Sequence, residues 1–465
     1  MSLHTSMTLI HSCLDVKRRH PKGEKMLKTG FAQEIITPPA GVGLAGYINK
    51  RPNRGFYDDL YVKVLAMDLD GKRFGIVSFD LCNVAPRLWE RLEKGITEKM
   101  GKELYESLII CATHTHTGPE FRGETINEIT SFALERTADA AIRAVEMAFL
   151  NMHESELEVG SVYNNPYGFV RRYFMKNGTI VTNPGWGNPD IDKPESDFDR
   201  TIGLIAVKQE GRLAGLICNI ANHGDTVGGD IVSADWYGFL AREIQYALKC
   251  GLPVLILDDA SGDINHFDFH QKINQTSPAE AARIGKGYAS IILDALKDLK
   301  KVEPAFVKIS NGKMTLPHYK LSEKEIAEAK NILETVPDIP KEGDLESQDL
   351  ANKVPAALRF FAKRALEGYE KSTPSHDCRL TSIVLGDDLA FVSLPGEPFN
   401  GIGRVIREKS PYKHTFIISL SQSVSGYVPM KECFERGGYE VQPGLNTASP
   451  EAAGIMIDEA LKNLL

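Results

Sequence analysis

Short apolar runs, of the length expected for buried strands, recur between residues 60 and 300 and again after residue 380. Longer segments between them repeat their apolar residues with a helical period. Strands are therefore predicted at Tyr61–Leu69, Phe74–Phe79, Ser107–Ala112, Ile202–Val207, Leu213–Ile220, Pro253–Leu257, Leu380–Leu385, Leu389–Leu394 and Thr415–Leu420. Helices are predicted at Asn127–Leu150, Asp235–Leu248, Pro278–Leu299 and Pro450–Leu464. Gly71 and Lys72 indicate a hairpin between the first two strands. This mixture predicts an α/β fold with mixed sheets flanked by helices.

Residues 320–375 have a different, more charged pattern. Ser322 and Glu325 have the spacing of a capping box at the start of one helix, and a second helix is predicted over Asp349–Glu370. We interpret this region as a helical insertion between two α/β portions. Surface decoration is its expected role, with a lid or an oligomer contact as the alternatives.

Composition narrows the class of protein. The chain has 465 residues, a net charge of −8 and 42% apolar residues, which is typical of a globular protein. An acidic balance disfavours nucleic acid as a partner, and no apolar run reaches the roughly 18 residues that stable membrane insertion requires. Residues 1–25 lack the order of charges and apolar residues found in a secretion signal. We therefore predict a loose extension at 1–25, a single domain at 26–465, and a cytoplasmic location. The seven dispersed cysteines are expected to be reduced core thiols.

Polar residues that are able to bind metals follow several of the predicted strands. His114 and His116 follow the strand ending at Ala112, and the segment His223-Gly224-Asp225 follows another. Asp258, Asp259, Asp263 and Asn265 follow a third strand, and Glu397 follows a fourth, within Pro395-Gly396-Glu397. The carboxyl ends of strands line the ligand crevice in open α/β sheets, so these residues are expected to share one site.

Histidine and carboxylate side chains are the ligands of catalytic zinc, which needs about three of them. His114, His223 and Glu397 are able to provide a His₂Glu set, although such ligands do not select zinc strongly over Mn²⁺ or Fe²⁺. The His-x-His pattern also occurs in metallo-β-lactamase-like hydrolases and in amidohydrolase barrels. Gly118 and Pro119 stand where the former need Asp and His, and the eightfold strand–helix rhythm of the latter is missing. Both alternatives fit less well.

Six motifs in order carry a resemblance to a known family. They are Thr113-His114-Thr115-His116-Thr117-Gly118-Pro119, Asn222-His223-Gly224, Ser233-Ala234-Asp235, Gly262-Asp263-Ile264-Asn265, Leu394-Pro395-Gly396-Glu397 and Gly426-Tyr427-Val428-Pro429. This order resembles the neutral/alkaline non-lysosomal ceramidases, and more closely the ceramidase-like proteins that consist of the catalytic domain alone. The resemblance implies the fold of that catalytic domain over 26–465, without the C-terminal immunoglobulin-like domain of longer ceramidases.

The resemblance also implies one zinc ion and a set of site residues. His114, His223, Glu397 and Tyr427 match the family's zinc ligands, and His116 matches a second active-site histidine. Arg171 falls near the family's essential arginine, with Arg172 as the alternative.

One departure from the family changes the expected substrate. Asn265 and His266 stand where ceramidases carry a catalytic serine and a proline. An amide is able to orient a substrate carbonyl but cannot transfer a proton as a hydroxyl does. We therefore expect a polar substrate smaller than ceramide.

The predicted function is zinc-dependent hydrolysis of an amide or ester bond in a small molecule. His116 is assigned to acid–base catalysis, Arg171 and Asn265 to catalysis, and Arg172 and His266 to substrate binding. Asp263, or Asp235, is expected to accept the second N–H of a zinc histidine. The alternative is a metal-containing binding protein that has lost turnover. The sequence leaves the oligomeric state open, including a homo-oligomer.

Overall fold

The computed structural model describes residues 26–49, 51–123, 126–343, 345, 347–371, 373–422 and 426–465. The predicted extension at 1–25 lies outside the described residues. Among the helices that are described, none is both long enough and apolar enough to cross a membrane. The fold is mixed α/β, as predicted, and is built on three mixed sheets of four or five strands.

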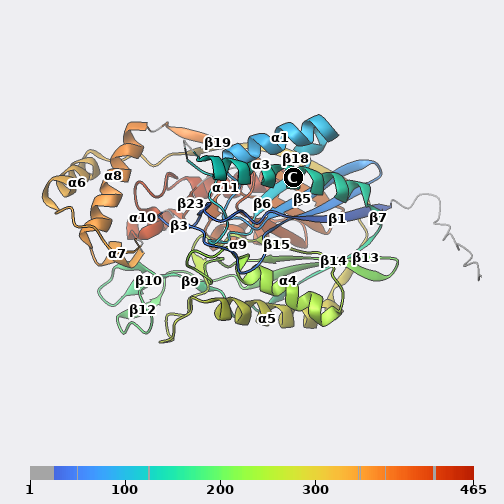
Figure 1. Cartoon of the computed structure of the whole chain (residues 1–465), viewed down its shortest axis with the longest axis horizontal. Coiled ribbons are helices and arrows are strands. Elements are labelled where there is room, and N and C mark those ends of the chain that lie inside the picture. Colours follow the sequence, from blue (N-terminus) through green and yellow to red (C-terminus); the bar gives the residue numbers. More distant parts are fainter. Residues whose placement is uncertain are drawn as a thin grey trace, which may run out of the picture.

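The first sheet has the strand order β6-β5-β4-β1-β7. Its strands are β1 (Leu27–Ile35), β4 (Tyr61–Leu69), β5 (Lys72–Phe79), β6 (Leu108–Ala112) and β7 (His153–Glu154). The helices α1 (Pro86–Met100), α2 (Lys102–Glu106) and α3 (Glu128–Leu150) pack on one face (Figure 1). The predicted hairpin joins β4 to β5, and its turn residues Asp70 and Gly71 have φ of 54° and 83°, the left-handed values that a two-residue hairpin turn requires.

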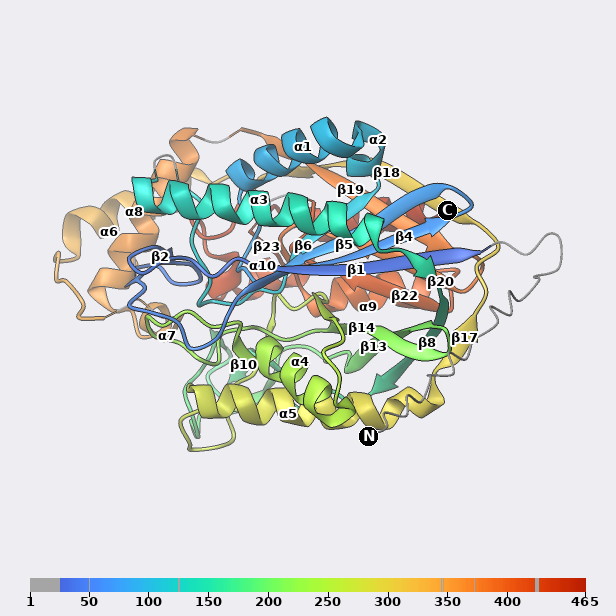
Figure 2. The ribbon, with the colours of Figure 1, turned by 45° about the vertical axis from the view of Figure 1, so that its right-hand side comes forward.

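The second sheet has the order β15-β14-β13-β8-β17. Its strands are β8 (Glu156–Tyr163), β13 (Thr201–Gln209), β14 (Arg212–Ile220), β15 (Val254–Asp258) and β17 (Lys300–Val302). The helices α4 (Asp235–Leu248) and α5 (Pro278–Ala295) cover its outer face (Figure 2). Ser277 caps α5, and a 3₁₀ turn, η1 (Leu296–Asp298), ends it earlier than the pattern predicted.

The third sheet has the order β18-β19-β20-β22. Its strands are β18 (Val307–Pro317), β19 (Ser375–Leu385), β20 (Leu389–Ser393) and β22 (His414–Ile418). The helices α9 (Asn400–Lys409) and α11 (Ala452–Leu464) pack on its outer face.

One central core joins the three sheets. Leu65 and Met67 of β4, Ile205 and Val207 of β13, and Phe391 of β20 belong to it. The alternate residues of the same strands lie under the helices, because successive side chains of a strand point to opposite faces. The strands are therefore apolar on both faces, which explains why they appear in the sequence as continuous apolar runs.

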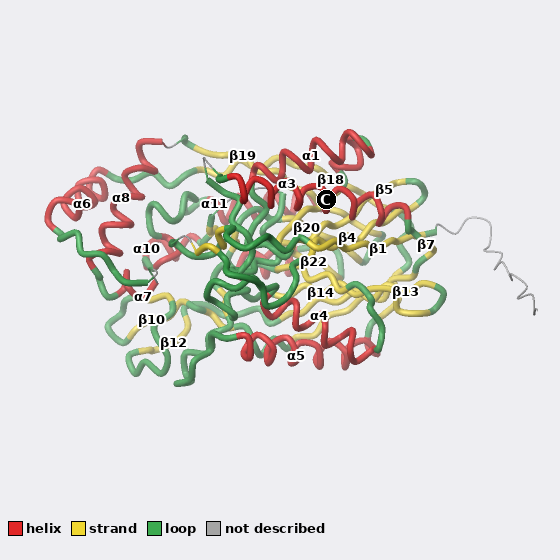
Figure 3. Tube along the Cα trace, in the orientation of Figure 1, coloured by secondary structure: helices red, strands yellow, loops and turns green. Residues whose placement is uncertain are grey.

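Each large sheet contains one parallel pair of strands: β5–β6, β14–β15 and β20–β22. The loops that follow these strands converge with several short strands: β2 (Gly43–Leu44), β3 (Arg51–Pro52), β9 (Phe169–Val170), β10 (Arg172–Met175), β11 (Ile180–Thr182), β12 (Ile191–Pro194), β16 (Ile264–Asn265), β21 (Glu397–Pro398) and β23 (Tyr427–Val428). Figure 3 shows loops gathered between the strand-rich part of the molecule and the helices at its other end. Two short elements, α10 (Lys431–Arg436) and η2 (Tyr439–Val441), follow β23 along the chain.

The region 320–375 is helical, as predicted, and contains α6 (Glu323–Thr335), α7 (Ser347–Ala351) and α8 (Pro355–Lys371). The predicted single helix Asp349–Glu370 is wrong: it is divided between α7 and α8. Lys353 adopts φ of 54° just before Pro355, which has no N–H to continue a helix. Elsewhere the patterns missed β8 and β18, because exposed polar residues alternate with buried ones along them.

Candidate metal centre

The loop after β6 holds His114 and His116 in a fixed geometry. The His114 N–H donates to the carbonyl of Leu81 (2.8 Å), and the His116 N–H donates to the carbonyl of Gly224 (2.8 Å). His114 has φ of 77°, a conformation that costs a non-glycine residue about 1–3 kcal/mol and is concentrated at functional sites. The Thr115 hydroxyl donates to the carbonyl of Ser233 (2.7 Å). Neighbouring loops therefore hold the strained backbone in place.

His223 follows β14 and lies against this loop. A Cβ on Gly224 would approach the carbonyl oxygen of His114 to 2.9 Å and a ring carbon of Tyr237 to 2.5 Å. Glycine is therefore required for the two loops to pack so closely. The indole N–H of Trp236 donates to the carbonyl of His223 (2.9 Å) and fixes its backbone.

Glu397 lies after β20, and the Gly-Asp motif at 262–263 supports its loop. A Cβ on Gly262 would meet the Glu397 carbonyl oxygen at 2.3 Å, so glycine allows the two backbones to touch. The carboxylate of Asp263 accepts hydrogen bonds from the Asn400 N–H (2.7 Å) and the Ser196 hydroxyl (3.3 Å). This motif therefore has a supporting role behind Glu397 in the structure.

Three of the residues predicted as metal ligands come together. Glu397 Oε2 lies 3.4 Å from His114 Nε2 and 3.7 Å from His223 Nε2, and it has no hydrogen-bond partner. A tetrahedral ion with bonds of about 2.0–2.1 Å separates its ligand atoms by roughly 3.4 Å. The spacing and the unpartnered oxygen thus fit a divalent cation held by these three side chains, each of which offers one ligand atom.

Two of the three groups have the charge state that metal binding needs, and the third does not. Burial opposes protonation of His114, but Cys82 and Glu397 raise its pKa well above the ordinary value, so a bound cation would have to displace that proton. Burial, followed by the charge of Arg171, lowers the pKa of His223 to about 3, so its imidazole is neutral at pH 7. Burial opposes ionisation of Glu397, but His114 and His223 hold its pKa well below the ordinary value. Neutral imidazole and ionised carboxylate are the forms that bind metals.

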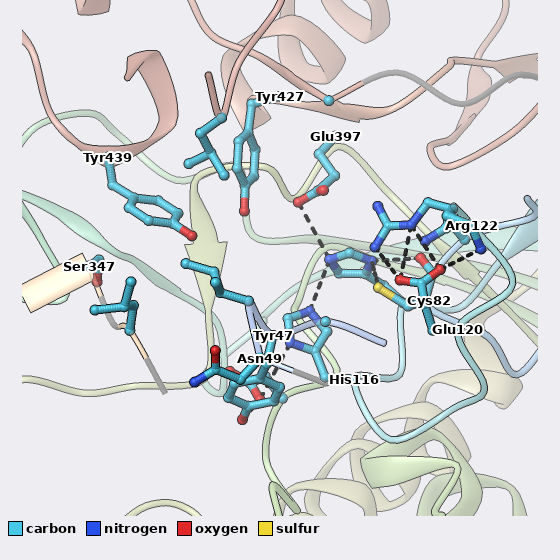
Figure 4. A pocket seen from close by; sticks show the side chains of 18 of the residues that line it. Tyr47, Asn49, Cys82, His116, Glu120, Arg122, Ser347, Glu397, Tyr427 and Tyr439 are labelled. Atoms are coloured by element: carbon cyan, nitrogen blue, oxygen red, sulfur yellow. Dashed lines mark hydrogen bonds and ion pairs between the residues drawn. The ribbon is translucent and has the colours of Figure 1, made fainter. Parts of the chain in front are cut away.

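Tyr427, the fourth predicted ligand, lies beside Glu397. The two residues are partners in the parallel pair β21–β23. Their side chains point into the same space in Figure 4. The tyrosine ring also lies 5.0 Å from the guanidinium carbon of Arg171. Its role as a ligand stays a prediction.

The adjacent arginines face different surroundings. Arg171 Nη1 lies 3.1 Å from His223 Nε2, its Nε donates to Glu440 (2.8 Å), and its buried Nη2 has no hydrogen-bond partner. Arg172 instead pairs with Glu195 and Glu440 and is fully buried. Of the two, Arg171 lies at the candidate metal centre, while Arg172 belongs to a buried ion network.

His116 lies next to the three predicted ligands. Its Nε2 is 3.3 Å from His114 Nε2, and its Nδ1 is 3.5 Å from Asp225 Oδ1. The hydroxyl of Tyr47 donates to the same carboxylate oxygen in a short hydrogen bond. Gly46 packs directly on the His116 ring, where a Cβ would approach to 2.4 Å. His116 is thus held on one side by Asp225 and on the other by the loop that contains Tyr47.

The remaining predicted residues lie behind the site. The Asn265 amide donates to Asn183 (2.7 Å), and its oxygen accepts from the Phe267 N–H (3.0 Å). His266 is buried, with Nε2 3.0 Å from the carbonyl of Gln275. Asp235 accepts hydrogen bonds from backbone N–H groups near the start of α4. The orienting contact of His114 Nδ1 is to the carbonyl of Cys82 (2.9 Å), not to Asp235 or Asp263.

A cavity of about 1430 Å³ opens over the centre, lined by His114, His116, Glu397, Tyr427 and Arg171 among others. Leu345, Ser347, Gln348, Phe360 and Arg364, all from the region 320–375, line it as well. The expected role of this region as surface decoration is therefore wrong. Side chains of α7 and α8 reach the cavity, and only the tertiary structure brings them there.

Solved structures with this fold include neutral ceramidase from Pseudomonas aeruginosa, with a TM-score of 0.70, 16% identity, and coverage of 95% of this chain and 74% of that one. A structure described as ceramidase complexed with C2 has a TM-score of 0.68 and 16% identity, and the match covers 95% of this chain and 75% of that one. The fold is thus that of the neutral ceramidases, as the motifs predicted. No protein-family model and no curated protein matches the chain.

Several residues of the site were not assigned from the sequence. Cys82 Sγ lies 3.6 Å from His114 Nδ1 and forms a second possible metal-binding group with His114 and His116. Tyr47 and Glu440 come from segments that carried no motif, so no sequence signal pointed to them. Asp225 lies within His223-Gly224-Asp225, two residues after a predicted ligand, and this position could have indicated that it belongs to the site.

Proposed function

We propose that the protein is a metal-dependent hydrolase that cleaves an amide or ester bond in a compact polar molecule, with Zn²⁺ as the first candidate for the metal. The observation that carries the proposal is the convergence of His114, His223 and Glu397, of which His114 and Glu397 line a large cavity. Tyr427 is the proposed fourth ligand. A bound divalent cation supplies Lewis acidity, which polarises a carbonyl and makes water a stronger nucleophile near neutral pH.

His116 is the proposed general base. Burial lowers its pKa, so its imidazole is neutral and able to accept a proton. Its Nδ1 lies 3.5 Å from Asp225 Oδ1, and its Nε2 lies 3.3 Å from His114 Nε2, on the side of the centre. Arg171 presents the unpartnered Nη2 to an anionic or carbonyl oxygen of the substrate.

Two observations favour a substrate smaller and more polar than ceramide. Asn265, at the position of the family's serine, has no hydroxyl, and its amide is hydrogen-bonded to Asn183. The cavity wall supplied by the region 320–375 carries the polar residues Ser347, Gln348 and Arg364 beside Leu345 and Phe360, so it offers hydrogen-bond partners to a polar group of the substrate.

Removal of the metal tests the proposal directly. We expect the purified protein to hydrolyse at least one member of a panel of small N-acyl amides and esters. Prolonged chelation should abolish that activity, and stoichiometric Zn²⁺ should restore it, because the Lewis acid is essential. Activity that survives in metal-free protein, verified by elemental analysis, would contradict the proposal.

Replacing Asp225 by asparagine should impair catalysis without removing the metal. An asparagine amide is able to donate toward Nδ1 of His116 and stabilise the wrong tautomer, so we expect kcat to fall by about 10²–10⁴-fold with KM little changed. Asp230→Asn is the matched control, since Asp230 lies in the same segment and pairs with Arg54 at the surface. If Asp225→Asn and wild type have equal kcat values, the contact between Asp225 and His116 has no role in catalysis.

A second candidate function is binding without turnover, which the loss of the serine hydroxyl at Asn265 favours. In that case the metal is present at full occupancy, the panel is not hydrolysed, and an uncleaved amide binds in a metal-dependent manner. Binding and turnover measured on the same metal-loaded sample separate the two functions.

A further inference from the structure

A thiol lies beside the candidate metal centre and has no role in the proposed reaction. Cys82 is in the loop after β5, it lines the cavity, and it is 5% exposed. Its Sγ lies 3.6 Å from Nδ1 of His114. In the view of Figure 4, Cys82 and His116 lie on one side of the site and Glu397 and Tyr427 on the other. The centre is therefore bordered by a soft sulfur ligand as well as by a hard carboxylate.

His114 is able to bind a metal together with either side. Its Nδ1 contacts the carbonyl of Cys82 (2.9 Å), so Nε2 is the nitrogen left to a metal. This Nε2 lies 3.4 Å from Glu397 Oε2 and 3.3 Å from His116 Nε2. One nitrogen lone pair binds one ion. An ion held by His114 with Glu397 and an ion held by His114 with His116 therefore exclude each other.

The side with the thiol forms a complete set of ligands. Cys82, His114 and His116 each offer one ligand atom, and these three atoms lie within 4.8 Å of one another. A three-coordinate ion with bonds of about 2.0 Å to nitrogen and about 2.3 Å to sulfur separates its ligand atoms by roughly 3.5–3.7 Å. The 3.3 Å between the two Nε2 atoms is close to this separation. The sulfur therefore has to move by at most about 1 Å for the set to hold an ion.

The ligands indicate which kind of cation each side prefers. Thiolate sulfur is a soft ligand that selects Cu⁺, whereas carboxylate oxygen suits harder ions. Zn²⁺ accepts both kinds of ligand, and the side with Glu397 offers it His223 and the proposed ligand Tyr427 as well. Cu⁺ gains little from a carboxylate, and the side with Cys82 gives it one sulfur and two nitrogens.

We propose that Cys82, His114 and His116 form an inhibitory site for a soft cation, Cu⁺, which competes with the catalytic metal for His114. Binding of Cu⁺ does not depend on the proposed function, whereas the inhibition rests on it. An ion bound there takes one ligand from the catalytic metal and occupies the lone pair of His116, the proposed general base. Binding releases the thiol proton of Cys82 to the solvent and changes no oxidation state.

The test compares two variants that should fail in opposite ways. Both are made in a parent protein with Cys250→Ser, which removes an exposed thiol, and Cys13→Ser, which removes a thiol outside the described residues. Cu⁺ affinity is measured without oxygen, against a competing chelator. Cys82→Ser should weaken Cu⁺ binding by more than about 100-fold and leave Zn²⁺ binding unchanged, because a hydroxyl is a poor ligand for a soft ion. Glu397→Ala should weaken Zn²⁺ binding and leave Cu⁺ binding unchanged.

X-ray absorption at the copper edge identifies the ligand directly. A sulfur neighbour of Cu⁺ is expected in the parent protein and not in Cys82→Ser. Unchanged Zn²⁺ binding by Cys82→Ser would show that this variant is folded, so its loss of Cu⁺ binding reports the missing ligand. Equal Cu⁺ affinity in Cys82→Ser and its parent, or loss of Cu⁺ binding in Glu397→Ala, would overturn the proposed site and leave the metal centre intact.

Competition between the two ions tests the shared histidine. Cu⁺ added to the zinc-loaded parent should release Zn²⁺ and stop hydrolysis, and the same addition to Cys82→Ser should do neither. Cu⁺ that binds without releasing Zn²⁺ would overturn the proposed competition for His114. Cu⁺ binding that depends on Cys82, in a protein that binds no divalent cation, would support the site and overturn the proposed function.

Discussion

Replacing His114 by alanine is expected to lower the affinity for the metal by more than about 100-fold, because even residues that only orient a ligand change affinity by about 10–100-fold. Glu397→Ala should have the same result, since its Oε2 lies between His114 and His223. Elemental analysis of the purified variants, and titration of the apoprotein with Zn²⁺ in a competing chelator, measure the effect.

The matched control for this prediction is His270→Ala. His270 is exposed and lies outside the possible metal-binding groups of the described residues. The His270→Ala variant should bind the metal as tightly as the wild type does. Full metal occupancy in both His114→Ala and Glu397→Ala would show that the ion, if bound, lies elsewhere.

Replacing Glu440 by glutamine is expected to lower the free energy of unfolding by about 3–5 kcal/mol, since it removes one partner from a buried ion network. The Glu440 side chain is fully buried between Arg171 (2.8 Å) and Arg172 (2.6 Å). It also accepts a hydrogen bond from the Thr182 hydroxyl (2.8 Å). Urea unfolding of the metal-free variant and wild type measures the difference. Glu459→Gln, which removes an exposed pair with Lys462, should change it by no more than about 1 kcal/mol.

The pH dependence of this effect gives an independent check. Burial opposes ionisation of Glu440, but Arg171 and Arg172 together lower its pKa below the ordinary value. Its stabilising contribution is therefore complete above the unfolded pKa of about 4.3 and is lost as pH falls through the lower folded value. The difference between wild type and Glu440→Gln should persist at pH 6–7 and narrow in acid. A difference that widens in acid would contradict the assignment.

The sequence predicted the main strands well because they are apolar on both faces. β4, β14 and β20 lie between the central core and a helical layer, so their runs are continuous. It missed β8 and β18, whose exposed residues interrupt the runs, and it merged α7 with α8. The spacing and number of apolar residues indicate which positions are buried. They therefore predict an element poorly when half of its residues are exposed.

By itself, the sequence determined which residues follow the buried strands, and their order predicted the ceramidase fold and the candidate ligands His114, His223 and Glu397. A histidine or glutamate side chain is able to bind a metal whatever packs around it, so the sequence alone was enough to name these candidates. The tertiary structure alone decided that Glu440 joins Arg171 to Arg172, that Asp225 faces His116, and that Arg364 reaches the cavity. These contacts join segments that are distant along the chain, and a local pattern of residues does not predict which distant loops will come into contact.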